Sequence, residues 1–259
     1  MNSRYRWNWL ALCALIALGA TSKTWGKSEI NTEWNHTTMS IENPNDSVLI
    51  VTFGNSITAV RKTVDQVFAQ RLPGLLAREG VKASVINSGI GGSHTGRRAD
   101  HDLFKIRHGM DRFQSDVLDH QPDLVIIGFG TNDSYIDSKT PKGKSRIPLD
   151  AYRSNLEHFI TKLRANGSKI VLIAPNILGA RYGKFQNKRL LKYVKVVRKL
   201  SRKYDTGLVD NYKGFQQYAK AQNISYEALM LDGCHPNDTG HELIADHLTT
   251  EIVKQLKSD

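Results

Sequence analysis

VLIVTFGNS, residues 48–56, is the segment from which the architecture of this 259-residue chain can be worked out. Residues 48–53 are apolar or β-branched throughout, a pattern typical of a strand that is buried on both faces of a sheet. Gly54 ends this run, and the polar residues Asn55 and Ser56 follow it directly. Similar short apolar runs recur along the chain, over residues 83–86, 124–127, 170–174 and 208–209.

The segments between these runs contain the three-to-four-residue apolar spacing of helices. We expect helices over residues 63–79, 102–120, 149–166, 187–204 and 238–257. Strands that alternate with helices predict an α/β fold, here a flavodoxin-like three-layer α/β/α sandwich with a mainly parallel five-stranded sheet. Ligands bind such sheets at the carboxyl ends of the strands, so function is expected in the loops that follow the strands.

The N-terminal region has the composition of an export signal. Arg4 and Arg6 precede an apolar run over residues 9–20, which is shorter than the ~20 residues needed to span a bilayer. We therefore expect an exported protein, periplasmic or extracellular, with no stable membrane insertion after signal cleavage; a retained signal anchor is the alternative. The expected organisation is a signal peptide over residues 1–26, a polar leader over 27–45 and one folded domain over 46–259.

Composition excludes several classes of protein. Apolar residues make up 40% of the chain, as in a globular protein rather than a disordered one. Removal of a signal peptide would leave Cys234 as the single cysteine, so we expect no internal disulfide. The net charge of +11 either favours acidic substrates or simply keeps the protein soluble. Because no nucleic-acid-binding motif is recognisable, we expect no nucleic-acid partner.

Polar groups are concentrated in four loops of the predicted sheet. Their sequences are Gly54-Asn55-Ser56-Ile57, Asn87-Ser88-Gly89-Ile90-Gly91-Gly92, Gly130-Thr131-Asn132-Asp133 and Asp232-Gly233-Cys234-His235-Pro236. Ester hydrolysis by a serine needs a base, a carboxylate that orients the base, and fixed donors for the oxyanion. Ser56 can be the nucleophile, His235 the base and Asp232 the orienting carboxylate. The oxyanion donors expected are the Ser56 amide, the Gly92 amide and the Asn132 side chain.

In order and spacing, these four loops resemble the sequence blocks of the SGNH (GDSL-type) hydrolase family, over about residues 46–256. The resemblance implies that Ser56, Asp232 and His235 are the catalytic residues. It also implies that Ser56, Gly92 and Asn132 form the oxyanion hole. The chain departs from the family at Asn55, where aspartate is usual. We expect activity to survive this change; asparagine keeps the size and an acceptor but loses a charge, which leaves the hydrogen bonding around the turn open.

Several of these residues also have plain structural explanations. Ser56 alone would be read as a helix cap, and His235 as a structural histidine. Cys234 is expected to be a small packed residue rather than a nucleophile. Metal-ligating residue types also occur together at Asp100, His101, Asp102 and His108. Charged residues on an exposed helix are the commoner explanation of such a cluster, so we expect no metal, and no cofactor is predicted.

Two polar, basic insertions flank the expected site, over residues 134–148 and 176–188. Neither has a Leu- or Phe-rich surface for a long acyl chain, so we expect a short acyl group such as acetyl on a polar or anionic alcohol. The build is similar to that of bacterial exported carbohydrate esterases, which implies an acyl-enzyme mechanism on an acetylated polysaccharide or a small ester. The side chains expected to bind substrate are Tyr135, Arg146, Arg181 and Tyr182.

For these four side chains, packing of the loops explains the tyrosines equally well, and solvation explains the arginines. Two other functions also stay open. A lysophospholipase, thioesterase or arylesterase would use the same catalytic groups on a different ester. A non-catalytic glycan-binding protein could share the scaffold, but the intact serine, histidine, aspartate and asparagine of the four loops argue against it.

Overall fold

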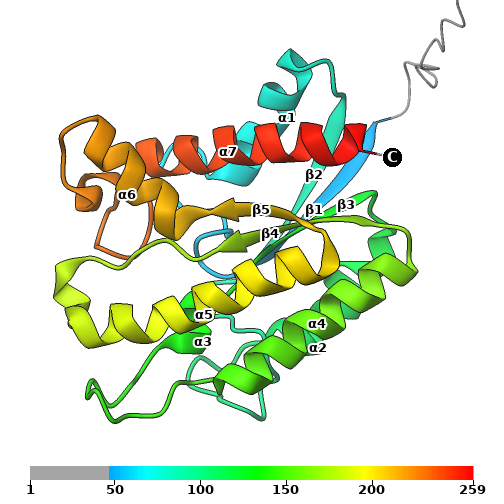
Figure 1. Ribbon diagram of the computed structural model, residues 1–259. Coiled ribbons are helices and arrows are strands. Elements are labelled where there is room, and N and C mark those ends of the chain that lie inside the picture. Colours follow the sequence, from blue (N-terminus) through cyan, green and yellow to red (C-terminus); the bar gives the residue numbers. More distant parts are fainter. Residues whose placement is uncertain (1–46, 259) are drawn as a thin grey trace, which may run out of the picture. The chain divides into compact units, whose positions relative to one another are not determined.

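The computed structural model describes residues 47–258, which form a sheet between two layers of helices (Figure 1). Within these residues the sheet has five strands, all parallel, in the order β2-β1-β3-β4-β5. The strands are β1 (Val48–Gly54), β2 (Ala83–Gly89), β3 (Leu124–Gly128), β4 (Lys169–Ala174) and β5 (Gly207–Asp210). This order is that of flavodoxin-like folds and confirms the predicted sandwich. The predicted signal peptide and leader, residues 1–45, lie outside the described residues.

Helices cover both faces of the sheet. The α-helices of the described region are α1 (Phe68–Arg78), α2 (Gly109–Asp116), α3 (Thr131–Ser134), α4 (Leu149–Ala165), α5 (Gly183–Tyr204), α6 (Asn211–Ala221) and α7 (Asp238–Lys257). Short 3₁₀ turns are η1 (Leu118–His120), η2 (Ala180–Tyr182) and η3 (Tyr226–Leu229). α1, α6 and α7 pack on one face, and α2, α4 and α5 pack on the other (Figure 1).

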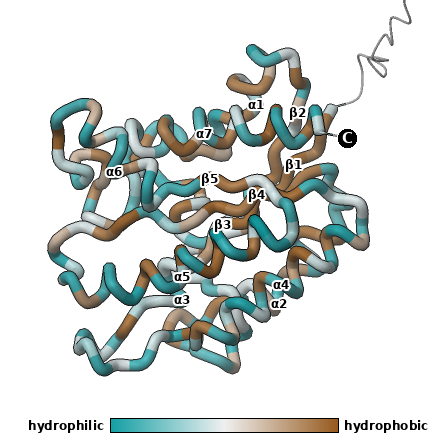
Figure 2. Tube along the Cα trace, in the orientation of Figure 1, coloured by the Kyte–Doolittle hydropathy of each residue, from teal (hydrophilic) through white to brown (hydrophobic). Residues whose placement is uncertain are grey.

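Alternating residues of each strand enter two separate cores. In β3, Leu124 and Ile126 pack against α1 and α7, whereas Val125 and Ile127 pack against α4 and α5. Because both faces of the central strands β1, β3 and β4 are covered, these strands are mostly apolar without a polar alternation, and Figure 2 shows them in the hydrophobic centre of the fold. This double burial is why the short apolar runs predicted the strands well.

The helix predicted over residues 102–120 is wrong in its first half, since α2 begins only at Gly109. His108 is extended, with φ −99° and ψ −178°, and its amide donates to the Asp111 carboxylate at 3.1 Å. The Gly109 Cα lies against the Thr95 carbonyl, where an added Cβ would stand 2.8 Å away. The helix therefore begins only where the chain has passed its close contact with Thr95, a contact between separate segments that local periodicity cannot reveal.

The helix predicted over residues 63–79 is also shorter in the structure. Val67 is extended at φ −73° and ψ 161°, and its amide donates to the Gln70 side chain at 3.0 Å, so α1 begins at Phe68. Val64 and Val67 are nevertheless buried. Their apolar spacing therefore indicates that this segment is buried, not that it is helical.

The remaining predictions agree more closely, and two helices were missed, the four-residue α3 and the longer α6. α7 coincides with the predicted residues 238–257, and the Asn237 side chain caps it by accepting from the Gly240 amide at 3.0 Å. α6 was not expected, yet it follows β5 at once, with Asp210 as its cap at 3.2 Å from the Lys213 amide. Among residues 47–258, no helix has both the length and the apolar character to cross a bilayer.

Candidate active site

Ser56 lies in a tight turn at the carboxyl end of β1. The Asn55 carbonyl accepts from the amides of Thr58 and Ala59 at 3.1 and 3.0 Å. The Asn55 side chain, 2% exposed, accepts from the Ile57 amide at 2.9 Å through Oδ1. An Asx-type turn of this kind needs only an acceptor oxygen, which asparagine and aspartate both provide. The hydrogen bonding that the sequence put in doubt is thus made by a neutral amide.

Three side chains from distant parts of the chain form a hydrogen-bonded row. Ser56 Oγ lies 2.9 Å from His235 Nε2, and His235 Nδ1 lies 2.8 Å from Asp232 Oδ2. A carboxylate only accepts, so Nδ1 donates to Asp232, and Nε2 is left to accept the Ser56 proton. The Ser56 and His235 positions are 179 residues apart in sequence, and the fold brings together the three residues that the sequence predicted.

The loop that carries Asp232 is wound around its carboxylate. Oδ1 accepts from the amides of Cys234 and His235 at 3.0 and 2.9 Å. Burial raises the pKa of this carboxyl, but the hydrogen bonds from His235 and Cys234 outweigh that effect and lower the pKa to about 2. Asp232 is therefore ionised at neutral pH, as a group that orients an imidazole must be.

Cys234 is a packed residue, as predicted. It is 8% exposed, and burial raises the pKa of its thiol to about 12. Its carbonyl accepts from the Asn176 side chain at 3.0 Å. A protonated, enclosed thiol is a poor nucleophile.

Gly92 and Asn132 lie in adjacent loops at the same edge of the sheet. The Gly92 φ is +80°, and its amide has no partner within the described residues. Asn132 Nδ2 donates to the Ser93 carbonyl at 3.0 Å, which ties the two loops together. Gly54 at the end of β1 is in register with Gly89 and Gly128, so both loops leave the sheet level with the Ser56 turn.

Asp133 holds the Asn132 loop in place through hydrogen bonds to Thr95 and Gly130. It is fully buried, and its carboxylate accepts from the Thr95 amide at 2.8 Å, from the Thr95 hydroxyl, and from the Gly130 amide at 3.0 Å. Burial raises the pKa of Asp133, against the opposing effect of the Thr95 hydrogen bonds. The sequence showed Asp133 only as the neighbour of Asn132, and its structural role was missed.

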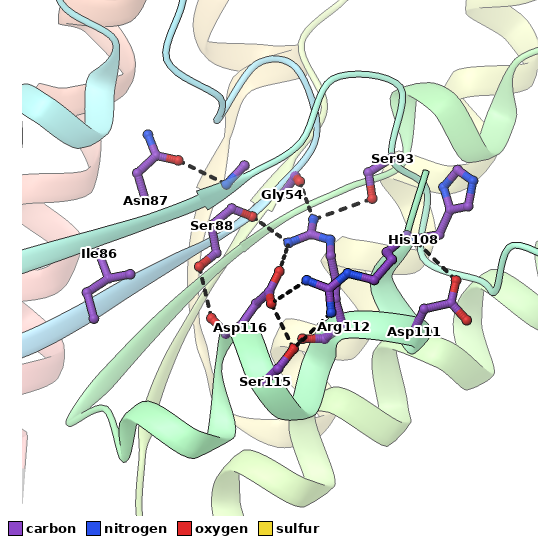
Figure 3. A network of polar contacts seen from close by, with 12 residues as sticks. Gly54, Ile86, Asn87, Ser88, Ser93, His108, Asp111, Arg112, Ser115 and Asp116 are labelled. Atoms are coloured by element: carbon purple, nitrogen blue, oxygen red, sulfur yellow. Dashed lines mark hydrogen bonds and ion pairs between the residues drawn. The ribbon is translucent and has the colours of Figure 1, made fainter. Parts of the chain in front are cut away.

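Arg112 of α2 is a buried residue that sequence reasoning missed entirely (Figure 3). Its guanidinium donates to the Gly54 carbonyl at 2.8 Å and to the Ser88 carbonyl at 2.7 Å, and it reaches the Ser93 hydroxyl at 3.4 Å. Asp116, at 3.3 Å, is its ion-pair partner. Arg112 therefore joins the Ser56 turn to the loop of Gly92, and an arginine in a polar helix carries no sequence signal of such burial.

Comparison with known proteins identifies the family of the chain. Residues 52–243 match the GDSL-like Lipase/Acylhydrolase family. This chain belongs to that family. It is an ester-hydrolysing enzyme, and the resemblance to GDSL-type hydrolases found in the sequence is confirmed.

Individual relatives of this GDSL hydrolase are esterases or have no stated activity. It is 34% identical over 167 residues to the uncharacterized lipoprotein YqeF of Bacillus subtilis, an alignment that covers 58% of this chain and 63% of YqeF, less than two thirds. It is 24% identical to an arylesterase of Vibrio mimicus, covering 80% and 89% of the two chains. It is 25% identical to an acetylxylan esterase of Geobacillus stearothermophilus, covering 65% and 71%.

Solved structures share the fold of the GDSL hydrolase. The lipase/acylhydrolase from Enterococcus faecalis superposes with a TM-score of 0.64 at 26% identity, covering 79% of this chain and 95% of the other. The agreement extends over nearly the whole described domain. It places this five-stranded sheet within the architecture of the family.

Of the side chains predicted to bind substrate, Arg146 behaves differently from the other three. It is 7% exposed, its guanidinium pairs with Asp137 at 2.7 Å, and it donates to Asn132 Oδ1 at 3.3 Å. Arg146 therefore contacts the Asn132 amide directly, and its binding of a substrate stays a prediction. Tyr135 and Tyr182 face each other edge to face at 6.4 Å between ring centroids, and Arg181 lies 5.5 Å from the Tyr182 ring centroid.

His101 and His108 do not lie on an exposed helix; His108 is fully buried just before α2, and His101 is half-buried. His108 stacks on His94 with ring centroids 3.5 Å apart and an interplanar angle of 7°. His101 pairs with Asp137 at 3.1 Å. Within residues 47–258 no group of three or more His, Cys, Asp and Glu side chains is arranged to hold a metal ion.

Proposed function

We propose that this GDSL hydrolase is a serine esterase that removes short acyl groups, chiefly acetyl, from carbohydrate hydroxyls through an acyl-enzyme. The observation that carries the proposal is the hydrogen-bonded row Ser56–His235–Asp232, with contacts of 2.9 and 2.8 Å. It supplies a nucleophile, a base within reach of the nucleophile, and an ionised group that holds the base in the required tautomer.

In the first half-reaction, Ser56 Oγ attacks the ester carbonyl carbon while His235 Nε2 takes the hydroxyl proton. The resulting oxyanion accepts hydrogen bonds from the amides of Ser56 and Gly92 and from Asn132 Nδ2. Asn132 Nδ2 has two hydrogens, and only one is used on the Ser93 carbonyl. One such donor contributes about 3–4 kcal/mol to the stabilisation of the transition state.

Collapse of the tetrahedral intermediate breaks the bond to the alcohol, which leaves with the proton returned by His235. In the second half-reaction, water attacks the acyl-enzyme, and His235 takes the water proton. A second tetrahedral intermediate forms at the same donors. Its collapse releases the carboxylic acid and returns the proton to Ser56.

Two observations support acetyl esters of carbohydrate as substrates. The segments around the candidate site, residues 134–148 and 176–188, are polar and basic and contain no run of apolar residues for a long acyl chain. An acetylxylan esterase is also among the relatives. We also propose that the protein acts outside the cytoplasm, in line with the N-terminal apolar run and a relative described as a lipoprotein.

The deciding experiment is acetate release from acetylated polysaccharides, with p-nitrophenyl acetate and p-nitrophenyl octanoate as synthetic esters. We expect hydrolysis of the acetyl ester, loss of that activity in Ser56→Ala, and labelling of the wild type alone by a fluorophosphonate. A rate that rises from acetyl to octanoyl would favour a lipid or thioester substrate instead. A wild type that neither reacts with the probe nor cleaves any ester would favour a glycan-binding protein.

A further inference from the structure

A pocket of about 250 Å³ lies between the segment after α3 and the segment that leads into α5. One wall carries Tyr135, three residues beyond Asn132. The opposite wall carries Arg181, which donates to the Asp232 carbonyl at 3.3 Å. The pocket therefore contacts the loop of Asp232 through Arg181, and its Tyr135 belongs to the segment that follows Asn132.

The floor of the pocket is rigid. Gln186 of α5 is 2% exposed, and its side chain donates to the Ser134 carbonyl at 3.1 Å and accepts from the Ile136 amide at 3.2 Å. These two bonds tie one wall of the pocket to the helix that carries the other. The pocket is thus already formed without a ligand, as sites for small molecules usually are.

The pocket carries positive charge that the protein does not neutralise. Arg181 and Lys139 both line it, and neither forms an ion pair with any residue of the described region. Two carboxylates of the flanking loops are already engaged. Asp137 is held by Arg146 and His101, and Asp232 by His235.

Aromatic side chains complete the lining. Tyr135 and Tyr182 meet edge to face, Phe185 lines the same pocket, and the Arg181 guanidinium lies over the Tyr182 ring. Aromatic rings offer apolar surface to the C–H faces of a sugar, and a guanidinium matches the planar fork of a carboxylate with two parallel hydrogen bonds. A ligand that has both a sugar ring and a carboxylate is a sugar acid.

We propose that this pocket is the acceptor subsite of the enzyme and that it selects acetylated glycans whose sugars carry carboxylates, uronate-containing chains, over neutral ones. This inference rests on the proposed function, since it assigns the alcohol side of the same ester. Arg181 binds the carboxylate, Lys139 adds to the field at the pocket mouth, and the tyrosines hold the sugar ring.

The kinetic test compares acetylated polygalacturonate with acetylated xylan, a neutral chain. We expect kcat/KM of the wild type to be higher on the uronate chain than on xylan. Arg181→Ala should lower this preference about tenfold. Salt at about 0.5 M should lower it as well, because it screens exposed charge. Lys220→Ala is the matched control, because Lys220 is an exposed cation of α6 outside the pocket. An unchanged preference in Arg181→Ala overturns the subsite while leaving the esterase intact.

A binding test is independent of turnover. Calorimetry of the Ser56→Ala variant with a non-acetylated oligogalacturonate should show saturable binding that weakens about tenfold when Arg181→Ala is added. Absence of saturable binding overturns the subsite. Binding of the oligouronate by an otherwise wild-type chain that hydrolyses no ester would instead support the subsite and overturn the proposed esterase.

Discussion

The guanidinium of Arg112 donates to the carbonyl of Gly54 at 2.8 Å, two residues before Ser56. Arg112 is fully buried and lies 4.4 Å from the Phe53 ring centroid. Burial lowers the pKa of its guanidinium to about 10, so it remains charged at neutral pH. Because the buried guanidinium donates hydrogen bonds to the carbonyls of both Gly54 and Ser88, it fixes the distance between the ends of β1 and β2 and so between the two loops that follow them.

We predict that Arg112→Met lowers kcat about 10–100-fold with little change in KM, because a small displacement of the Ser56 turn relative to Gly92 misaligns nucleophile and oxyanion donors. The carbonyls of Gly54 and Ser88 also lose a donor, so the free energy of unfolding should fall by about 2–4 kcal/mol. Steady-state kinetics on p-nitrophenyl acetate and urea denaturation measure both effects.

Two further variants distinguish positioning from general stability. Arg112→Lys keeps the charge and should recover part of kcat. Asp116→Asn removes the ion pair but leaves the bonds from Arg112 to Gly54 and Ser88, so it should lower stability with a much smaller effect on kcat. Equal losses of kcat in all three variants at equal stability would argue against positioning by Arg112.

We predict that Asp232→Asn lowers kcat about 10²–10⁴-fold while the protein stays folded. The asparagine oxygen can still accept from the amides of Cys234 and His235, but its NH₂ group cannot accept from His235 Nδ1. The imidazole then loses the tautomer that accepts the Ser56 proton. Kinetics and thermal unfolding test this, and a loss of less than about fivefold would exclude Asp232 as the orienting carboxylate.

We predict that Asn55→Asp stays within about threefold of wild-type activity and that Asn55→Ala loses about tenfold. Aspartate keeps the acceptor for the Ile57 amide, whereas alanine removes it and leaves that amide unpaired. Alanine should also lower the free energy of unfolding by about 1–2 kcal/mol. If alanine were as active as the wild type, the Asx-type turn would not be what positions Ser56.

We predict that the protein loses stability as the pH falls from about 6.5 towards 4. Burial lowers the pKa of His94 and lowers that of His108 to about 4, so both are neutral in the folded state while the unfolded chain takes up protons. The stability is therefore present above pH 6.5 and is lost as the pH falls through the folded pKa. The charged groups acting on His108 are His94, His101, Asp102 and Asp111.

The measurement is the difference in unfolding free energy between pH 7 and pH 5. His108→Asn should reduce this difference, since an asparagine oxygen can replace His108 Nδ1 as the acceptor of the His94 amide but takes up no proton. An unchanged difference in this variant would show that other groups cause the acid sensitivity. His241, whose pKa burial also lowers to about 4, would then be the next residue to replace.

The parts of this protein that local pattern determines were predictable from the sequence. Strands buried on both faces appear as short apolar runs, and a mainly parallel sheet between two layers of helices followed from the alternation of strands and helices. Ser56 stood out as a polar residue directly after a buried strand, and Asp232 and His235 as a carboxylate and an imidazole three residues apart in the loop before the last helix. Their mutual contact was predicted as chemistry, and the hydrogen bonds of 2.9 and 2.8 Å agree with it.

Tertiary structure alone decided which charged side chains are free and which are enclosed. Arg112 looks like an ordinary surface arginine in the sequence, yet it is buried beside the Ser56 turn, and Arg146, expected to bind substrate, contacts Asp137 and Asn132. Arg181 forms no ion pair with any residue between 47 and 258. Periodicity reports the burial of a residue's own segment, whereas the partner of a charge is set by chain segments far away in sequence, which only the folded chain brings into contact.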